Sequence, residues 1–215
     1  MSSIKKDNTT NIIYLFINRI LDIICSLIGC IFIIPIAIII KISYILTGDF
    51  KSIFYSHERI GKNGKIFKLY KFRSMVPNAD EILKEMLKDP EHLKEWNENH
   101  KFNKDPRITK IGNFLRKSSL DEMPQFLNVL KGDMSLIGPR PLVKGELDIH
   151  NGSHEIYESV KPGITGWWAC NGRSVTSYDK RLELEYYYCK NCGIILDIKC
   201  IIKTIAAVIL KTGAK

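Results

Sequence analysis

An uncharged stretch near the N-terminus restricts what this chain can fold into. Residues 23–40 form a run of 18 residues without a charged side chain, rich in isoleucine and leucine, with Arg19 and Asp22 before it and Lys41 after it. As one helix the run would be about 27 Å long, just short of the roughly 30 Å hydrocarbon core of a bilayer. A helix that is apolar on every side needs lipid or a large protein around it, and this chain has only 215 residues. The run therefore predicts a membrane segment.

Pro35 and the flanking charges indicate how this segment meets the membrane. Proline removes a backbone donor and clashes with the preceding turn, so the sequence predicts a kink or break near Ile34. Positive charges stand on both sides of the run: Lys5, Lys6 and Arg19 before it, and Lys41, Lys51, Arg59, Lys62 and Lys65 after it. Both flanks therefore favour the cytoplasm, which predicts a re-entrant helix-break-helix, with a single transmembrane span as the alternative. A secretory signal peptide is disfavoured, because the run starts late and no small-residue cleavage site follows it.

Composition limits the rest of the chain. Lys and Arg total 32 against 23 Asp and Glu, a formal charge of +9, which favours an anionic partner. With 45% hydrophobic residues the chain can bury a core, which excludes wholesale disorder. Six cysteines without a secretory signal favour reduced thiols facing the cytoplasm. We expect two parts: residues 1–48, a tail and the re-entrant membrane helix, and residues 49–215, a cytosolic, membrane-associated catalytic domain.

Local patterns predict a fold that is mainly α with a small β-hairpin, an α/β catalytic domain with interfacial helices. Asn63-Gly64 between two apolar-rich stretches predicts a hairpin over residues 54–72. Residues 78–102 carry apolar side chains at helical spacing, with a break at Asp89-Pro90, and so predict a helical pair. Residues 182–188 and 194–210 predict closing amphipathic helices. The second carries a basic stripe, Lys199, Lys203 and Lys211, which suits a helix on an anionic membrane surface or a helix packed on its own domain.

A zinc module is a weaker hypothesis. Cys189 and Cys192 have the spacing of half a zinc site, and His150 and His154 could supply the other half. No second cysteine pair with metal spacing exists, and the two histidines flank an Asn-Gly-Ser loop. Chance spacing explains this pattern better.

Asp121 and Glu122 have two interpretations. In the first, they belong to a capping box in which Ser119 caps a helix and Glu122 reaches back to it. In the second, a helix that begins near Pro124 exposes unpaired N–H groups and a positive dipole end, to which phosphate binds. A carboxylate there stays ionised at neutral pH and can act as a nucleophile, while a second carboxylate can help hold Mg²⁺ on a substrate's phosphates.

Arginines on both sides of this pair support a phosphate substrate. Arg116 and Arg140 could offset the repulsion between two carboxylates and a phosphate, because guanidinium groups bind phosphate oxygens in bidentate fashion. Pro139 and Pro141 stiffen the backbone around Arg140. Farther on, a Gly-rich loop carries Trp167, Trp168 and Arg173, and tryptophan can stack on a base or a sugar.

The residues resemble the bacterial polyprenyl-phosphate phosphoglycosyl transferases of the monotopic type, which initiate capsule, exopolysaccharide and glycoconjugate synthesis. Five motifs occur in that family's order: Lys-Phe-Arg-Ser-Met at 71–75, Asp-Pro-Arg-Ile-Thr at 105–109, Ser-Leu-Asp-Glu at 119–122, Gly-Pro-Arg-Pro at 138–141 and Asn-Gly-Arg at 171–173. The resemblance covers about residues 20–210. The length is similar to that of the catalytic domain alone of larger members.

The resemblance implies a Mg²⁺-dependent, ping-pong transfer at the membrane face. Carried over by position, Asp121 is the nucleophile that attacks the sugar-linked phosphate of a UDP-sugar, releasing UMP, after which undecaprenyl phosphate collects the phosphosugar. Glu122 is its Mg²⁺-associated partner, so Asp121 and Glu122 are the catalytic and metal residues. The substrate-binding residues are four arginines: Arg73, Arg116, Arg140 and Arg173.

The resemblance favours a hexose donor, galactose or glucose, with a UDP-N-acetylhexosamine as the alternative. Its other implied features are membrane lipids as partners, no nucleic acid, and a place in the bacterial cytoplasmic membrane with the catalytic domain facing the cytoplasm. A homodimer stays open. A hypothesis from another class is a non-catalytic basic scaffold anchored in the membrane, which the charge of +9 also fits.

Overall fold

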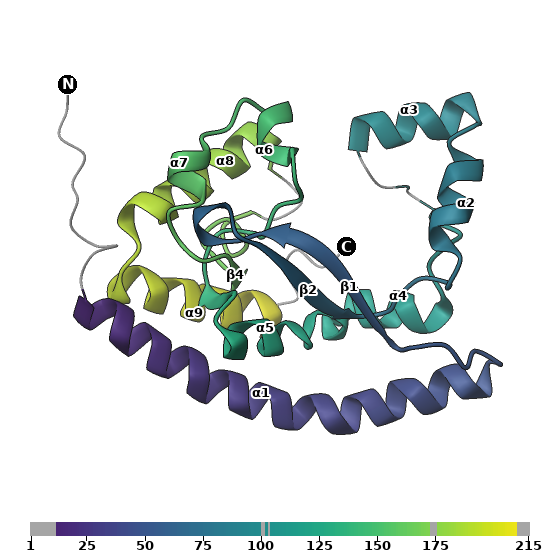
Figure 1. Ribbon diagram of the computed structural model, residues 1–215, viewed down its shortest axis with the longest axis horizontal. Coiled ribbons are helices and arrows are strands. Elements are labelled where there is room, and N and C mark those ends of the chain that lie inside the picture. The colour runs from purple at the N-terminus through teal and green to yellow at the C-terminus, as the bar shows by residue number, and fades with distance from the viewer. Residues whose placement is uncertain (1–11, 100–101, 103, 173–175, 210–215) are drawn as a thin grey trace. The chain divides into compact units, whose positions relative to one another are not determined.

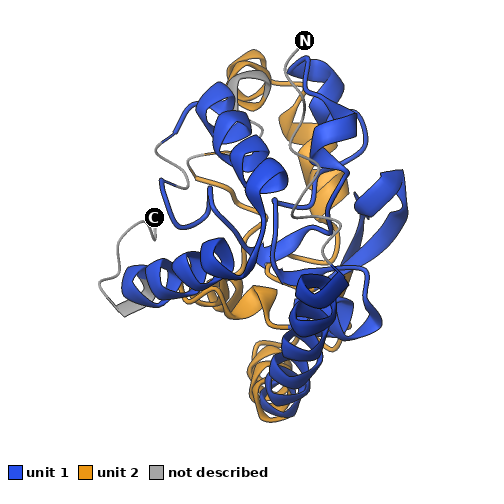
Figure 2. Cartoon of the chain, turned by 90° about the vertical axis from the view of Figure 1, so that its left-hand side faces the viewer, with its two compact units in different colours: residues 1–33, 56–70, 124–215 blue, residues 34–55, 71–123 orange. Residues whose placement is uncertain are grey.

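The structure is a computed structural model that describes residues 12–99, 102, 104–172 and 176–209 (Figure 1). Within those residues the fold is mostly helical and carries two small two-stranded sheets. The chain divides into two compact units, coloured differently in Figure 2. Unit 1 comprises residues 1–33, 56–70 and 124–215, and unit 2 comprises residues 34–55 and 71–123. The expected boundary near residue 48 stays a prediction.

The apolar run lies in α1, Ile12–Leu46, a continuous helix of 35 residues. The expected break is wrong, because the helix continues through Pro35, whereas the kink given as its alternative and the re-entrant arrangement stay predictions. Proline removes only one intrahelical hydrogen bond, while the long apolar sequence on either side keeps the helical pairing of the backbone. In the described part of the chain, α1 is the one helix that is long and apolar enough to cross a membrane. Many of its large side chains are exposed, including Ile24, Ile31 and Ile34.

The polar residues at the start of α1 bind unit 1. Arg19 donates to the carbonyl oxygens of Val129 (2.7 Å) and Leu130 (2.8 Å), at the end of α5, Gln125–Lys131. Asp22, which is buried, accepts the backbone N–H of Leu136 at 2.8 Å. The first turns of the apolar helix are therefore fixed to the polar part of the protein.

The hairpin prediction is confirmed. Strands β1 (Phe54–Ile60) and β2 (Ile66–Phe72) pair, and the 3₁₀ turn η1 (Lys62–Gly64) joins them. Asn63 and Gly64 have φ values of 58° and 74°, the left-handed region that Asn-Gly tolerates.

The helical pair in unit 2 is also confirmed. Helix α2 (Ala79–Met86) and helix α3 (Pro90–Asn99) flank the expected break. Helix α4 (Lys110–Lys117) and the 3₁₀ turn η2 (Leu120–Glu122) follow. The core of this unit includes the buried side chains of Tyr44, Ile53, Phe72 and Leu115.

Unit 1 contains a parallel strand pair that the sequence patterns did not predict. Strand β3 (Ser135–Ile137) pairs with β4 (Gly163–Thr165), and the connection between them holds the short helices α6 (Glu146–Ile149) and α7 (His154–Tyr157). At the end of β3 the two backbones approach closely: a Cβ atom on Gly138 would stand 2.4 Å from the carbonyl oxygen of Lys161. Only glycine fits there, which fixes the start of the Gly-Pro-Arg-Pro segment.

Two helices close unit 1, as expected. They are α8 (Tyr178–Asn191) and α9 (Ile194–Ile209), and Tyr188, Leu196 and Cys200 pack into the core beside Ile137. Helix α9 exposes several isoleucines. Lys199 and Lys203 of the basic stripe lie on this helix, whereas Lys211 lies outside the described residues.

Candidate active site

The site in unit 2 begins with a tightly seated helix. Thr109 caps α4 by accepting the N–H of Gly112 at 2.8 Å. A Cβ atom on Gly112 would stand 1.8 Å from the carbonyl oxygen of Ser74, so the helix lies directly on the segment after β2. Arg116, in the last turn, donates from Nε to Ser74 Oγ at 2.9 Å. The close approach at one end of α4 therefore fixes the arginine at the other end.

Asp121 lies on η2, directly after a residue in the left-handed region. Ser119 has a φ of 56° and makes no side-chain capping bond, so the capping-box interpretation is wrong. Asp121 itself is buried, with 9% of its surface exposed. Burial raises the pKa of Asp121, the charges of Lys71 and Arg116 act to lower it, and Glu122 adds to the rise. The structure therefore brings three predicted residues, Asp121, Glu122 and Arg116, into one electrostatic group.

Lys71 is a member of this group to which sequence reasoning gave no role. Its Nζ lies 2.7 Å from Glu122 Oε1, and both side chains are partly exposed. The two residues stand 51 positions apart, so helical or strand spacing could not have paired them. The available signal was the Lys-Phe-Arg-Ser-Met motif, in which Lys71 is the first residue. A cation therefore faces the carboxylate pair on the side of Glu122.

Arg73, a predicted substrate-binding residue, is 8% exposed and fully engaged within unit 2. Its Nη2 lies 2.8 Å from Asp49 Oδ2, and its Nε donates to the carbonyl oxygen of Ser52 at 2.7 Å. The guanidinium also lies 4.5 Å from the ring centre of Tyr44. These contacts tie the end of α1 to the site, and a contact between Arg73 and substrate stays a prediction.

The motif at residues 105–109 stabilises the segment that follows β2. Arg107 binds both carboxylate oxygens of Asp105, at 2.9 and 2.7 Å, and both side chains are 6% exposed. Its guanidinium carbon lies 5.5 Å from the ring centres of Trp96 and Phe102. The backbone of Arg107 accepts the N–H of Val76 at 2.8 Å, so this ion pair stabilises the chain just after Ser74.

The remaining predicted arginines belong to unit 1. Arg140 follows Pro139 in the loop after β3, and its side chain is exposed. Arg173 lies outside the described residues. Of the tryptophans before it, Trp168 donates to Thr176 Oγ1 at 2.8 Å and lies against Arg181, while Trp167 lies against Lys203.

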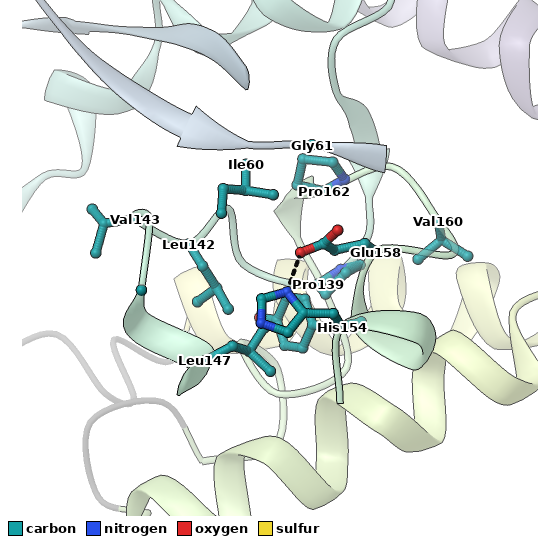
Figure 3. Close-up of a pocket in the computed structure, with 12 residues that line it drawn as sticks. Ile60, Gly61, Pro139, Leu142, Val143, Leu147, His154, Glu158, Val160 and Pro162 are labelled. Carbon is teal, nitrogen blue, oxygen red and sulfur yellow. Dashed lines mark hydrogen bonds and ion pairs between the residues drawn. The ribbon is translucent and has the colours of Figure 1, made fainter. Parts of the chain in front are cut away.

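The small cavity beside the Gly-Pro-Arg-Pro segment is too narrow for a nucleotide sugar (Figure 3). It measures about 10 Å³, which is room for one water molecule. Pro139, Leu142 and Leu147 line it, together with His154, whose two ring nitrogens lie 2.6 Å from Glu158 and 2.8 Å from Asp148. The second histidine of the zinc hypothesis, His150, stacks on Tyr178.

A magnesium ion at the carboxylate pair stays a prediction, with which the chemistry of the two side chains is compatible. Among the described residues no group of three or more His, Cys, Asp and Glu side chains could hold a metal ion. Mg²⁺ in nucleotide-dependent sites needs fewer protein ligands, because one or two carboxylates act together with substrate phosphates and water. Asp121 and Glu122 are hard oxygen donors on adjacent residues, which suits that kind of site.

Known proteins resemble this chain along most of its length. Residues 13–211 match the family described as bacterial sugar transferase. The chain is 46% identical over 200 residues to the undecaprenyl-phosphate galactose phosphotransferase of Salmonella typhimurium and 43% identical over 200 residues to the UDP-galactose-lipid carrier transferase of Erwinia amylovora. Each comparison covers 93% of this chain but 42% of the relative, so the chain spans less than half the length of these two proteins. The exopolysaccharide production protein ExoY of Sinorhizobium fredii is 40% identical over 197 residues, which cover 91% of this chain and 87% of ExoY.

Proposed function

The chain belongs to the family of bacterial sugar transferases, and on that premise we propose that it transfers galactose 1-phosphate from UDP-galactose to undecaprenyl phosphate with release of UMP. The names of two relatives support galactose as the sugar, and one of them names undecaprenyl phosphate. The observation that carries the proposal is the surroundings of Asp121, a buried carboxylate flanked by Lys71 and Arg116.

In the first half of the reaction Asp121 is the nucleophile. One of its carboxylate oxygens attacks the phosphorus that carries the sugar, and the bond from that phosphorus to the oxygen shared with the uridine-bearing phosphate breaks. UMP leaves with the electron pair, and the sugar phosphate stays on Asp121 as a mixed anhydride. Burial strips water from the nucleophile, while the positive charges of Lys71 and Arg116 favour its ionised form.

In the second half, an oxygen of undecaprenyl phosphate attacks the same phosphorus. The bond between phosphorus and Asp121 breaks, the free carboxylate returns, and the product is an undecaprenyl diphosphate sugar. No net proton transfer is needed in either half, so the site requires charge stabilisation rather than a general acid.

Four residues near Asp121 support charge stabilisation in this scheme. Ser74 holds Nε of Arg116, which directs the exposed terminal nitrogens of that arginine to the diphosphate. Lys71 holds Glu122 beside the nucleophile. Mg²⁺ bound by Asp121 and Glu122 would neutralise charge on the diphosphate and on the departing UMP.

We also propose that both ends of α1 lie at the same, cytoplasmic face of the membrane. The start of the helix binds unit 1 through Arg19 and Asp22. The end of the helix binds unit 2, where the hydroxyl of Tyr44 donates to the carbonyl oxygen of Arg73 at 2.8 Å. Residues 56–70 and 124–215 of unit 1 and residues 71–123 of unit 2 follow the apolar run in sequence, and α1 is the one described helix that could span a membrane. A plain span would separate its ends, whereas a helix that enters and leaves through one face, bending at Pro35, keeps both ends with the polar chain.

The activity is tested by UMP release from purified protein in detergent with Mg²⁺ and undecaprenyl phosphate. We expect release with UDP-galactose and much less with UDP-glucose or UDP-N-acetylgalactosamine. Asp121→Asn should abolish release and lipid labelling, while Asp80→Asn, an exposed position on α2, serves as the matched control. Preference for another donor would overturn the sugar, and full activity of Asp121→Asn would overturn the mechanism. No release with any of the donors would favour a non-catalytic scaffold.

Topology is tested with membrane-impermeant thiol labelling in intact and opened cells. The background replaces the cysteines that are not buried, Cys25, Cys30 and Cys170, by serine. Ile12→Cys and Leu46→Cys then report on the two ends of α1, where the native side chains are 80% and 81% exposed. We expect both cysteines to react only after the cells are opened. Labelling of one end in intact cells would show a plain span instead.

A further inference from the structure

The peptide unit of Arg140 is held from two sides by buried side chains of unit 1. Glu185 of α8 accepts the N–H of Arg140 at 3.0 Å through Oε1. Tyr157 of α7 donates its hydroxyl to the carbonyl oxygen of Arg140 at 2.9 Å. Glu185 is 1% exposed and Tyr157 is 5% exposed, whereas the side chain of Arg140 is exposed. The backbone is thus fixed inside the unit while the guanidinium reaches solvent.

The backbone before Arg140 has little freedom as well. Gly138 accepts no Cβ, because the carbonyl oxygen of Lys161 and the nitrogen of Gly163 stand too close. Pro139 and Pro141 have ring-locked φ angles on either side of the arginine. The two buried hydrogen bonds therefore fix a segment that is already stiff, and they determine the direction in which Arg140 leaves it.

Burying Glu185 is costly, which argues for a specific task. Within the described residues, Oε2 of Glu185 has no hydrogen-bond partner. The neighbouring Arg181, one turn earlier on α8, pairs with Glu146 at 3.2 Å, and its guanidinium lies 4.8 Å from the ring centre of Trp168. A leucine at position 185 would carry no unsatisfied carboxylate oxygen, but it would leave the Arg140 N–H without an acceptor. The acceptor for the Arg140 N–H is what an apolar side chain could not supply.

The ionisation of Glu185 reflects the same burial. Desolvation raises the pKa of Glu185 to about 7, although the Arg140 N–H and the charges of Arg181 and Arg140 act to lower it. The titratable and charged groups that face Glu185 are Arg140 from the loop after β3, Tyr157 from α7, and Arg181 and Cys189 from α8 itself. A protonated Glu185 keeps Oε1 as an acceptor, so the bond to Arg140 does not depend on the charge.

We propose that Glu185 is a positioning residue: it fixes the Arg140 peptide within unit 1, so that the guanidinium has a fixed point of attachment from which to bind a phosphate of the nucleotide sugar. This inference rests on the proposed function and on the prediction, drawn from the family resemblance, that Arg140 binds the UDP-sugar. Tyr157 completes the arrangement from the carbonyl side. Pre-positioning matters because an arginine that must be ordered during binding loses part of its interaction to conformational entropy.

The test distinguishes three contributions of Glu185: its acceptor oxygen, its charge and its effect on folding. Glu185→Gln keeps an acceptor oxygen at the same place, and Glu185→Leu removes it. We expect Glu185→Leu to raise the KM for the UDP-sugar and the Kd for UMP about tenfold, with a smaller change in kcat. Glu185→Gln should stay within about threefold of wild type. Tyr157→Phe, which removes only the hydroxyl, should weaken UMP binding in the same direction. Glu183→Gln, at an exposed position of the same helix, is the matched control.

A double-variant cycle with Arg140→Ala distinguishes positioning from general stability. If Glu185 acts through Arg140, Glu185→Leu should raise the KM no further once Arg140 is alanine. An equal, independent rise in both backgrounds would show that Glu185 acts only through stability and would overturn the inference. The inference would also be overturned if Arg140→Ala weakened UMP binding while Glu185→Leu and Tyr157→Phe left it unchanged. If Arg140→Ala itself leaves UMP binding unchanged, the predicted binding of the UDP-sugar by Arg140 is wrong, and the inference about Glu185 is overturned with it, while the proposed transfer reaction is not affected.

Discussion

Replacing Glu185 by glutamine should change how the stability of this protein depends on pH. Burial raises the pKa of Glu185 from an ordinary 4.5 to about 7, so the folded protein holds a proton that the unfolded chain releases. Below pH 4.5 both states are protonated and the group has no effect on the free energy of unfolding. As the pH rises to about 7, the free energy of unfolding falls, because the unfolded state binds fewer protons than the folded state.

The size of the effect follows from that interval. Each pH unit between the two pKa values is worth about 1.4 kcal/mol, so the wild type loses about 3 kcal/mol between pH 4.5 and pH 7 from this group, and the loss then levels off. Glutamine cannot ionise and still offers an acceptor to the Arg140 N–H. The free energy of unfolding of Glu185→Gln, relative to that of the wild type, should therefore rise by about 3 kcal/mol between pH 4.5 and pH 8.

Thermal unfolding in detergent across this pH range measures the difference. For a chain of this size, about 3 kcal/mol corresponds to roughly 6 to 12 °C in the midpoint, and the difference between the two proteins cancels the contribution of other titrating groups. Glu183→Gln, in which an exposed carboxylate is removed, should follow the wild type. A Glu185→Gln midpoint that stays parallel to the wild type from pH 4.5 to pH 8 would refute the reasoning.

Three further substitutions probe close packing and buried charge. Gly112→Ala places a Cβ 1.8 Å from the Ser74 carbonyl oxygen and should lower the free energy of unfolding by about 1–3 kcal/mol; an unchanged thermal midpoint would mean that α4 does not lie so close. Asp105→Ala leaves the charge of Arg107 buried without its partner and should lower the free energy of unfolding by about 3–5 kcal/mol. Adding Arg107→Met should restore part of that free energy, and a double variant that is no more stable than Asp105→Ala would contradict the reasoning. In Gly29→Leu the new side chain would clash with Phe126 of α5, because a Cβ atom on Gly29 would stand 2.5 Å from the Phe126 ring. We expect this clash to separate α1 from α5 and to speed proteolysis, and unchanged proteolysis would exclude the contact.

Features that depend on neighbours in sequence were predictable. The apolar run, the Asn-Gly hairpin and the break at Asp89-Pro90 each follow from spacing or from the conformational range of one or two residues, and the structure has all three. The catalytic roles of the adjacent residues Asp121 and Glu122, drawn from a short motif, stay predictions. Short-range preferences do not decide between two conformations that the same residue can adopt. Ser119 could have capped a helix, but it takes a left-handed backbone conformation instead.

Pairings between distant residues could not be predicted in this way. The ion pair of Lys71 with Glu122 spans 51 positions, and the hydrogen bond of Glu185 to Arg140 spans 45. Whether Pro35 kinks or breaks α1 was likewise left open by the sequence, and the structure excludes the break, because a proline inside a long apolar helix loses one hydrogen bond without ending the helix.

By itself, the sequence determined that the chain has an apolar helix, a small hairpin and a pair of carboxylates among arginines, because periodicity, turn residues and charge act over a few positions. Only the tertiary structure decided which cations surround the carboxylates and which buried side chains hold Arg140. Those contacts form when packing brings remote segments together, and burial then alters the chemistry of the groups involved, as it raises the pKa values of Asp121 and Glu185.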